Sequence, residues 1–505
     1  MPTITQSAPQ STVATAHRAS WRAVAASIFS FPVMCVFLLV GVIFKNLPRG
    51  LAEPDVWWHM RNAQYLLQHH SFPNFDTYST GAAGSSWINF EWLSEIPYLL
   101  AFQSFGLQGL LLVYFAVLAL IFIGVYYRGC RAGADCKDAT VVTLLAILLG
   151  VVSLGPRTLL FGWLCMVGLL LVVDHFERTG TGLWLLPPIF LLWINLHGSW
   201  VFGFVVLGIV TASGLLEGHW GGIEARRWSA VELKRLIIAG LASFVALFIN
   251  PYGYKLVLYP FDFLFRQHNV MEYIEEWQPV DLSTTNGKLA MVVIFGLLAA
   301  VLFSRRKWKL EEALLMAFAL FEGLSHVRFL FFLGIIMVPI LAPRLHLFPP
   351  YERELDKPWL NAIIMTAVVA AMVAFFPSQA RLQQKVDEKF PVAALDFMHG
   401  QGISGKVFNE LSWGGYMEWN TPQLKPFIDT RLDIFMYNGA FTDKVKVGSL
   451  QAPLEILDKR NFDYVLVRPD DPLTYVLEHS TIWRSIYSDK VAIVFSRTAN
   501  TSAGS

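Results

Sequence analysis

Long apolar runs bounded by clusters of charged residues dominate the pattern along this chain. Most runs are about 17 to 20 residues long, the length that an α-helix needs to cross a lipid bilayer. We predict about eleven membrane spans, of which the fifth and ninth are short enough to be tilted or partial. Their predicted ranges are 27–45, 107–127, 139–155, 158–174, 183–195, 199–216, 231–249, 289–304, 310–322, 328–345 and 359–376.

After about residue 377 the pattern changes to short strand-like runs that alternate with helical ones, which predicts a small α/β domain. The strand-like runs are 406–408, 427–429, 464–467 and 491–496, and the helical runs are about 387–399, 439–448, 451–459 and 471–479. We therefore predict a polytopic α-helical membrane protein with a small C-terminal α/β extracytoplasmic domain. Its predicted parts are a disordered cytoplasmic tail (1–26), a transmembrane domain (27–376) and the α/β domain (377–505).

The composition agrees with a membrane-embedded chain and excludes a soluble globular class. Of the 505 residues, 55% are hydrophobic and only 15% are charged, and the mean hydropathy is +0.48. A net charge of +1 argues against a nucleic-acid partner, which would require a basic face. Cys130 and Cys136 have no histidine pair after them, so free thiols are expected instead of a zinc site or a disulfide.

Lysine and arginine gather in alternate loops, such as 128–137, 226–235 and 305–309. By the positive-inside rule these loops are cytoplasmic, and so is the N-terminus. The opposite, outer face then carries the first outer loop (46–106), the turn at 195–198, a second outer loop (250–288) and the C-terminal domain. Because the inner loops are short and basic, we expect the reactive groups to gather at the outer face.

The first outer loop contains the strongest candidates for chemistry. Asp55 directly follows the first span, and Asp76 comes later in the loop, after a turn at Pro73. Residues 56–69 have the pattern of an amphipathic interfacial helix with tryptophans at headgroup depth, and 91–105 is a second candidate for such a helix. Two carboxylates at helix ends could share a divalent cation or serve as base and ligand. The alternative is that both are helix caps at a wet surface.

Two arginines and several other polar residues lie at the outer ends of later spans. Arg157 and Arg328 suit a lipid-linked phosphate, since a guanidinium can pair with two phosphate oxygens, although both could instead reach out to lipid headgroups. His197 breaks an apolar region beside a glycine turn. Glu272, Glu275 and Glu276 are so closely spaced that we expect at most one of them to reach a site. No phosphate-binding loop, nucleophile elbow, HExxH or dinucleotide fingerprint is present, so an activated substrate at this face would be lipid-linked.

Two stretches carry a family resemblance. MRNAQYLLQH and FPNFDTYS, each beside one of the loop acids, resemble the first outer loop of the GT-C superfamily of membrane glycosyltransferases, and the oligosaccharyltransferase catalytic subunit most of all. KVFNELSWGGYMEWNTPQLKPFIDTRLDIF is similar to the segment around the Trp-Trp-Asp motif of that subunit. The resemblance implies a glycosyltransferase that moves a sugar from a polyprenyl-phosphate-type donor to a glycan, lipid or protein acceptor. It places the reaction in the cell envelope, at the outer face of a bacterial plasma (inner) membrane.

The resemblance also implies roles for single residues. Asp55 and Asp76 match the catalytic acids and the ligands of a divalent cation, Mg²⁺ or Mn²⁺, which some relatives do not require. Arg328 matches the donor-phosphate contact, and Glu276 matches an acid of the late outer loop. The chain departs from the pattern at Trp413-Gly414-Gly415, which lacks the acid that recognises an asparagine acceptor. The residues expected to line the site are Trp58, His59, Arg61, Glu91, His197, Glu276, Asp429 and Arg431.

Two alternatives stay open from the sequence. A transporter or flippase of lipid-linked glycans would need a polar track across the bilayer, and few charges lie inside the predicted spans. A non-catalytic assembly protein would use the C-terminal domain as a binding module. Asp429 and Arg431 could line an acceptor surface or could simply be polar groups at strand ends.

Overall fold

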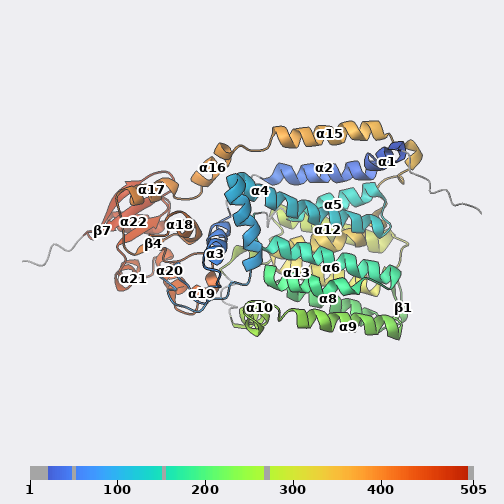
Figure 1. Cartoon of the computed structure of the whole chain (residues 1–505), viewed down its shortest axis with the longest axis horizontal. Coiled ribbons are helices and arrows are strands. Elements are labelled where there is room, and N and C mark those ends of the chain that lie inside the picture. Colours follow the sequence, from blue (N-terminus) through green and yellow to red (C-terminus); the bar gives the residue numbers. More distant parts are fainter. Residues whose placement is uncertain (1–20, 48–52, 151–154, 267–272, 499–505) are drawn as a thin grey trace, which may run out of the picture.

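The computed structural model describes residues 21–47, 53–150, 155–266 and 273–498, and these form a helical bundle beside a smaller α/β unit (Figure 1). The helix α3 (Asp55–His69) and the first part of α4 (Trp92–Arg131) lie between the two parts. Predictions for residues 1–20 and for Glu272 fall outside the described residues.

The bundle confirms that the long apolar runs are helices, because each predicted span coincides with one. Its remaining helices are α1 (Trp21–Ile28), α2 (Phe31–Asn46), α5 (Cys136–Gly150), α6 (Leu159–Thr179), η3 (Leu183–Leu185), α7 (Leu186–Leu196), α8 (Trp200–Ser213), α9 (Ala230–Ala246), α12 (Thr285–Phe303), α13 (Leu310–Ser325), η5 (Val327–Phe329), α14 (Leu330–Leu345), η6 (Arg353–Leu355) and α15 (Pro358–Ala374). Among the described residues, four helices are long and apolar enough to cross a membrane, or up to five if a bent pair counts as one. The number of spans therefore stays a prediction.

The helix α4 is bent at Gly106, which has a left-handed backbone conformation (φ 60°, ψ −144°). A side chain at this position would also collide with Gln379, whose Nε2 would lie 2.8 Å from the added Cβ. Glycine is thus required by the conformation, whereas the end of the flexible Gln379 side chain could move aside. The bend separates residues 92–105, predicted as a distinct helix before the second span, from the membrane-length part of α4.

A three-stranded sheet at the far end of the bundle was not predicted. It contains β1 (Gly218–Trp220), β2 (Ile223–Ala225) and β3 (Trp308–Lys309) in that order. The strands are only two or three residues long, too short for an alternating pattern to be seen in the sequence.

The C-terminal part is an α/β unit, as predicted. Its sheet has the order β4-β5-β7-β6, with β4 and β5 parallel and the other pairs antiparallel. Its elements are α16 (Gln379–Asp387), α17 (Val392–Gly400), β4 (Val407–Asn409), η7 (Leu411–Trp413), α18 (Gly414–Asn420), α19 (Leu432–Phe435), α20 (Ala440–Gly448), α21 (Pro453–Lys459), β5 (Tyr464–Val467), α22 (Pro472–Glu478), β6 (Trp483–Ser488) and β7 (Ile493–Arg497).

Several details of this unit differ from the prediction, and the strand β6 is among the elements that were not predicted. Residues 427–429 are not a strand, because the side chain of Asn409 accepts hydrogen bonds from the amides of Phe427 and Ile428 in place of a neighbouring strand. The helix predicted at 387–399 begins later, as α17 at Val392 after the N-cap residue Pro391, and the preceding helix α16 was not predicted.

The first outer loop and the C-terminal unit share a hydrophobic core. Trp58, Tyr78 and Trp87 from the loop belong to the same buried cluster as Phe427 and Phe435. Trp57 packs edge-on against Tyr416, with ring centroids 4.9 Å apart. The prediction that these loop tryptophans lie at headgroup depth is wrong, since Trp57 and Trp58 are only 3% and 7% exposed and bind the C-terminal unit.

The Gly414-Gly415 pair lies where α18 meets the start of α3. A Cβ on Gly414 would lie 2.1 Å from the carbonyl oxygen of Ile428, and a Cβ on Gly415 would lie 3.0 Å from that of Pro54. The departure from a Trp-Trp-Asp motif therefore has a structural cause. A side chain at Gly415 would press on the start of α3, whereas one at Gly414 would collide with Ile428 and Asp429 inside the C-terminal unit.

Candidate functional site

Asp55 is the first residue of α3, where the partial positive charge of the helix end stabilises a carboxylate. Its Oδ1 accepts hydrogen bonds from Thr430 Oγ1 and, at 3.5 Å, from Trp58 Nε1. Within the described residues its Oδ2 makes no hydrogen bond. The side chain is half-buried, so one oxygen is held in place while the other is available to a ligand.

Arg157, which precedes α6, is fixed by two carboxylates. Its Nε donates to Glu53 Oε2 at 2.6 Å, and its Nη1 donates to Glu276 from the short helix η4 (Glu275–Trp277). Tyr98 of α4 donates to the backbone carbonyl of Arg157 at 3.2 Å. Gly155 makes room for this arrangement, since a Cβ there would lie 2.7 Å from Glu53 Oε2.

Charges within this group influence one another strongly. Burial, the largest influence, raises the pKa of Glu53 to about 7 although Arg157 opposes the change. Burial also tends to lower the pKa of Arg157, but Glu53, Glu276 and Asp55 together raise it above its usual value. Arg157 is therefore a permanent cation, whereas Glu53 changes its charge near neutral pH.

Arg328 is positioned differently. Its guanidinium lies 4.6 Å from the centre of the Trp277 ring and 5.8 Å from that of Phe329. Its Nε is buried without a hydrogen-bond acceptor, and among the described residues Arg328 forms no ion pair. The charges of Glu276, Arg157, Glu91 and Asp55 lie close enough to act on it. We call Glu53, Asp55, Arg157, Glu276 and Arg328 the outer-end cluster.

A buried chain of histidines and glutamates adjoins the outer-end cluster. Glu91 Oε1 lies 3.1 Å from His197 Nε2, and Glu91 Oε2 lies 3.6 Å from His59 Nε2. His59 Nδ1 is 3.0 Å from Glu95 Oε1. His197 Nδ1 accepts the amide hydrogen of Ser199 at 3.0 Å, so in neutral His197 the ring proton is on Nε2 and is donated to Glu91.

The ionisation of this chain follows from its neighbours. Burial opposes the charged forms, but His197 and His59 lower the pKa of Glu91, and the two glutamates raise the pKa of His59. Glu91 is therefore an anion, held on the side of the cluster where it acts on Arg328.

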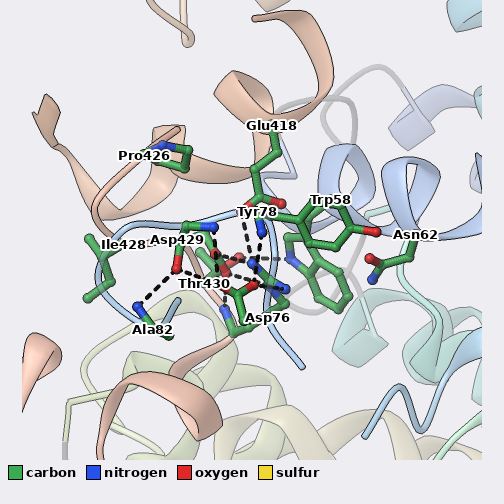
Figure 2. Close-up of polar contacts among 12 residues, drawn as sticks. Trp58, Asn62, Asp76, Tyr78, Ala82, Glu418, Pro426, Ile428, Asp429 and Thr430 are labelled. Carbon is green, nitrogen blue, oxygen red and sulfur yellow. Dashed lines mark hydrogen bonds and ion pairs between the residues drawn. The ribbon is translucent and has the colours of Figure 1, made fainter. Parts of the chain in front are cut away.

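Arg431 is the centre of a separate, closed group that joins the first outer loop to the C-terminal unit. It pairs with Asp429 at 2.6 Å, Glu418 at 2.9 Å and Asp76 at 3.0 Å. Its partners Asp76, Glu418 and Asp429 are labelled in Figure 2. The group is sealed by aromatic rings, whose centres lie 4.9 to 5.9 Å from the guanidinium carbon. These rings belong to Trp87, Tyr78 and Trp58. We call Arg431, Asp76, Glu418 and Asp429 the Arg431 cluster.

Comparisons with known proteins give little help with these residues. No family model matches the chain, and no curated protein matches it. Among solved structures it is similar to the Archaeoglobus fulgidus oligosaccharyltransferase in the apo form, with 12% sequence identity and a TM-score of 0.46. That similarity covers 92% of this chain and 74% of the other. The roles given below therefore rest on contacts within this chain.

The predicted pair of carboxylates is divided between the two clusters. Asp76 Oδ1 pairs with Arg431, and its Oδ2 accepts hydrogen bonds from the amide and hydroxyl of Ser79 at 3.0 and 2.6 Å. No contact joins Asp55 and Asp76 in the described part of the chain. Among the described residues, no group of three or more His, Cys, Asp or Glu side chains could hold a metal ion. The two acids therefore do not fit a shared metal site.

The structure also contradicts an acceptor surface at Asp429 and Arg431. These side chains are 0% and 3% exposed and are engaged with each other. Arg61 donates to Gln64 on its own helix and does not contact the outer-end cluster in the described residues. Trp58 lies between the clusters and donates to Thr430 at 3.1 Å.

The remaining predicted residues lie in the outer-end cluster and in the adjoining chain of His59, Glu91 and His197. Asp55, Arg157, Glu276 and Arg328 share one cluster, and of Glu275 and Glu276 only the latter reaches it. The prediction missed Glu53 and Thr430. Glu53 is two residues before Asp55 and Thr430 lies between Asp429 and Arg431, but no spacing rule separates such residues from ordinary loop residues.

Proposed function

We propose that this protein is a membrane-embedded glycosyltransferase that moves a sugar from a lipid-phosphate donor to an acceptor nucleophile. The observation that carries the proposal is the half-buried Arg328, whose guanidinium stacks on Trp277, whose Nε is buried without an acceptor, and which forms no ion pair among the described residues. Such a group is costly unless a ligand pairs with it, and phosphate oxygens match the guanidinium geometry. Arg328 thus provides the place for the leaving phosphate.

Asp55 provides the base. Its free Oδ2 takes the proton from the acceptor while Thr430 and Trp58 hold Oδ1. The acceptor atom forms a bond to the anomeric carbon of the sugar, and the bond from that carbon to the phosphate oxygen breaks. The electron pair goes to this oxygen, where Arg328 stabilises the new negative charge. Attack opposite the leaving phosphate inverts the anomeric centre.

The chain of His197, Glu91 and His59 supports this step by holding a negative charge near Arg328. Since Glu91 is an anion fixed between two imidazoles, it provides a constant field at Arg328 without pairing with it. A guanidinium stays charged in proteins, so Arg328 is a cation whose hydrogen bonds are available to a phosphate.

An apolar groove beside the site suits the lipid part of the donor. It has a volume of about 610 Å³ and is lined by α8, α9 and α10 (Tyr254–Arg266), mainly through aromatic side chains. Trp200 in its wall belongs to the segment that begins with His197. A Cβ on Gly198 would lie 3.7 Å from Pro260 of α10, so α10 packs directly against this segment. In this proposal the groove takes the isoprenoid chain of the donor.

The proposal also covers where the protein is located and which side of the membrane its site faces. The helices that are long and apolar enough to cross a bilayer support a membrane protein. With basic loops in the cytoplasm, the outer-end cluster and the C-terminal unit face the outside of a bacterial plasma membrane. Donors at that face are lipid-linked, in agreement with the groove.

The test is sugar transfer by membranes that contain the full chain, supplied with a panel of polyprenyl-phosphate and polyprenyl-diphosphate sugars. Asp55→Asn keeps the shape of the side chain and removes the base, so transfer should fall by about 10²-fold or more. Asp470→Asn removes an exposed carboxylate of the C-terminal unit and serves as the matched control. Equal rates for normally expressed Asp55→Asn and wild type would contradict the proposal.

A further inference from the structure

Arg157 occupies the place in the outer-end cluster where a cation bound by acids would be expected. Glu53 and Glu276 bind two of its nitrogens, and Asp55 adds a third negative charge nearby. In the described residues, the remaining nitrogen, Nη2, makes no hydrogen bond. The side chain is 23% exposed, so it is fixed by carboxylates on one side and partly open on the other.

This arrangement has the electrostatic features of a catalytic metal site without a metal. A bound divalent ion is held by carboxylates, keeps one position open to substrate and supplies positive charge to a developing anion. Arg157 is held by carboxylates and keeps one nitrogen open. A metal ion that used Glu53 and Glu276 as ligands would first have to displace the guanidinium from both of them.

We propose that Arg157 is the resident cation of this site and binds the donor phosphate together with Arg328, so that transfer needs no divalent ion. The inference rests on the proposed function and specifies how its substrate is held. The two arginines have different parts. Arg328 forms no ion pair among the described residues and binds the leaving phosphate. Arg157 is held in place by its two glutamates and donates from Nη2 to another phosphate oxygen.

Other polar groups near Asp55 are weaker candidates for a metal site or for the role of the resident cation. Asp76 uses both its oxygens within the Arg431 cluster, so it cannot complete a metal site around Asp55. Glu91 contacts the imidazoles of His197 and His59 with its two oxygens, so both of its oxygens are already engaged. Arg157 is the cation in direct contact with the acids that face Asp55.

The experiment uses the purified full-length protein and measures both the binding of sugar-free polyprenyl monophosphate and sugar transfer. Wild type is tested in a chelator and then with Mg²⁺ or Mn²⁺ restored. We expect binding and rate to change by less than about twofold, since no divalent ion takes part. Free Mn²⁺, followed by its paramagnetic resonance signal, should not be depleted by the wild-type protein.

Variants of Arg157 test the role of its guanidinium. Arg157→Ala should weaken polyprenyl monophosphate binding by about tenfold or more, and Arg157→Lys by less, because lysine keeps the charge but cannot be fixed by two acids. Added guanidinium ion should restore part of the binding to Arg157→Ala. A variant that is merely misfolded would not recover in this way.

The outcomes separate the two proposals. If the chelator removes wild-type activity and Mg²⁺ or Mn²⁺ restores it, the resident-cation proposal is overturned while the glycosyltransferase proposal stands. If Arg157→Ala binds the lipid phosphate as wild type does, the proposal is also overturned. If wild type neither binds the lipid phosphate nor transfers sugar with or without metal, both proposals fall.

Discussion

The outer-end cluster and the Arg431 cluster are made of the same residue types but differ in how completely those residues are paired. Arg431 forms ion pairs with three carboxylates, has three aromatic rings around it and is 3% exposed. Its Nη1 meets Asp76 as an ion pair without a hydrogen bond, and Glu418 Oε2 is buried without a donor among the described residues, so the closure lies in the charges. In the outer-end cluster, Arg157 keeps a free nitrogen and Arg328 has no anion among the described residues. Closed ion clusters of this kind hold a fold together, whereas incomplete ones are suited to a ligand.

The largest effect on stability is expected from opening the closed cluster. Arg431→Ala leaves three carboxylates buried without a counter-charge, which should lower the free energy of unfolding by about 3–5 kcal/mol. The C-terminal unit should then separate from the first outer loop. Thermal unfolding and limited proteolysis would show this.

A matched control for Arg431 is Arg460→Ala, which removes a partly exposed pair with Asp443. Its cost should be no more than about 1 kcal/mol. Equal unfolding temperatures for the Arg431 and Arg460 variants would mean that the closed cluster does not join the two parts.

Arg328→Ala should affect sugar transfer strongly and stability little, the reverse of what is expected for Arg431→Ala. The Arg328 variant removes a half-buried charge that forms no ion pair among the described residues, so the unfolding temperature should stay the same or rise. Sugar transfer should fall by about 10²–10³-fold, because the leaving phosphate loses its stabilising cation. Arg484→Ala, at an exposed arginine of β6, is the control and should affect neither quantity. A strongly destabilised Arg328→Ala protein would place this arginine in a structural role instead.

A smaller effect is expected where the two parts of the molecule meet. Gly415→Ala puts a methyl group 3.0 Å from the carbonyl of Pro54 and from the Trp58 ring. Relief of this contact should cost about 1–3 kcal/mol and move the start of α3, which carries Asp55. Gly400→Ala, in open space at the end of α17, is the control. The unfolding temperature of Gly415→Ala should be lower than that of Gly400→Ala. Equal unfolding temperatures would show that the junction tolerates side chains.

The smallest effect concerns pH. Burial raises the pKa of Glu53 to about 7 from its usual 4.5, so between these values the folded protein binds more protons than the unfolded chain. The contribution of Glu53 to stability therefore falls as pH rises from about 4.5 to 7. Glu53→Gln should remove this part of the pH dependence of thermal unfolding. Glu275→Gln, at an exposed neighbour of Glu276, should keep it, and an unchanged profile in Glu53→Gln would refute the assignment.

The sequence predicted the bundle well and the strands less well, for physical reasons. A long apolar run can only be a buried or membrane-spanning helix, so each predicted span matched one. The strand β5 was predicted residue by residue because Tyr464–Val467 is continuous and apolar. The strand β6 was missed, because it lies at the edge of the sheet and has exposed polar residues.

The site was predicted as a set of residues on one face but not as two clusters. Asp55 and Asp76 have similar surroundings in the sequence, and only contacts with the distant neighbours Thr430 and Arg431 separate them. Such pairs depend on how the C-terminal unit docks on α3. No local pattern records that docking, so the sequence alone could not assign Asp76 to the closed cluster.

The most direct measurement reconstitutes the full chain in proteoliposomes with a polyprenyl-phosphate sugar and follows both products. The account predicts that wild type releases free polyprenyl phosphate in equal amount to the transferred sugar, and that the double variant Asp55→Asn/Arg328→Ala releases neither. Intact sugar lipid that crosses the bilayer without cleavage, or turnover by the double variant at the wild-type rate, would contradict it.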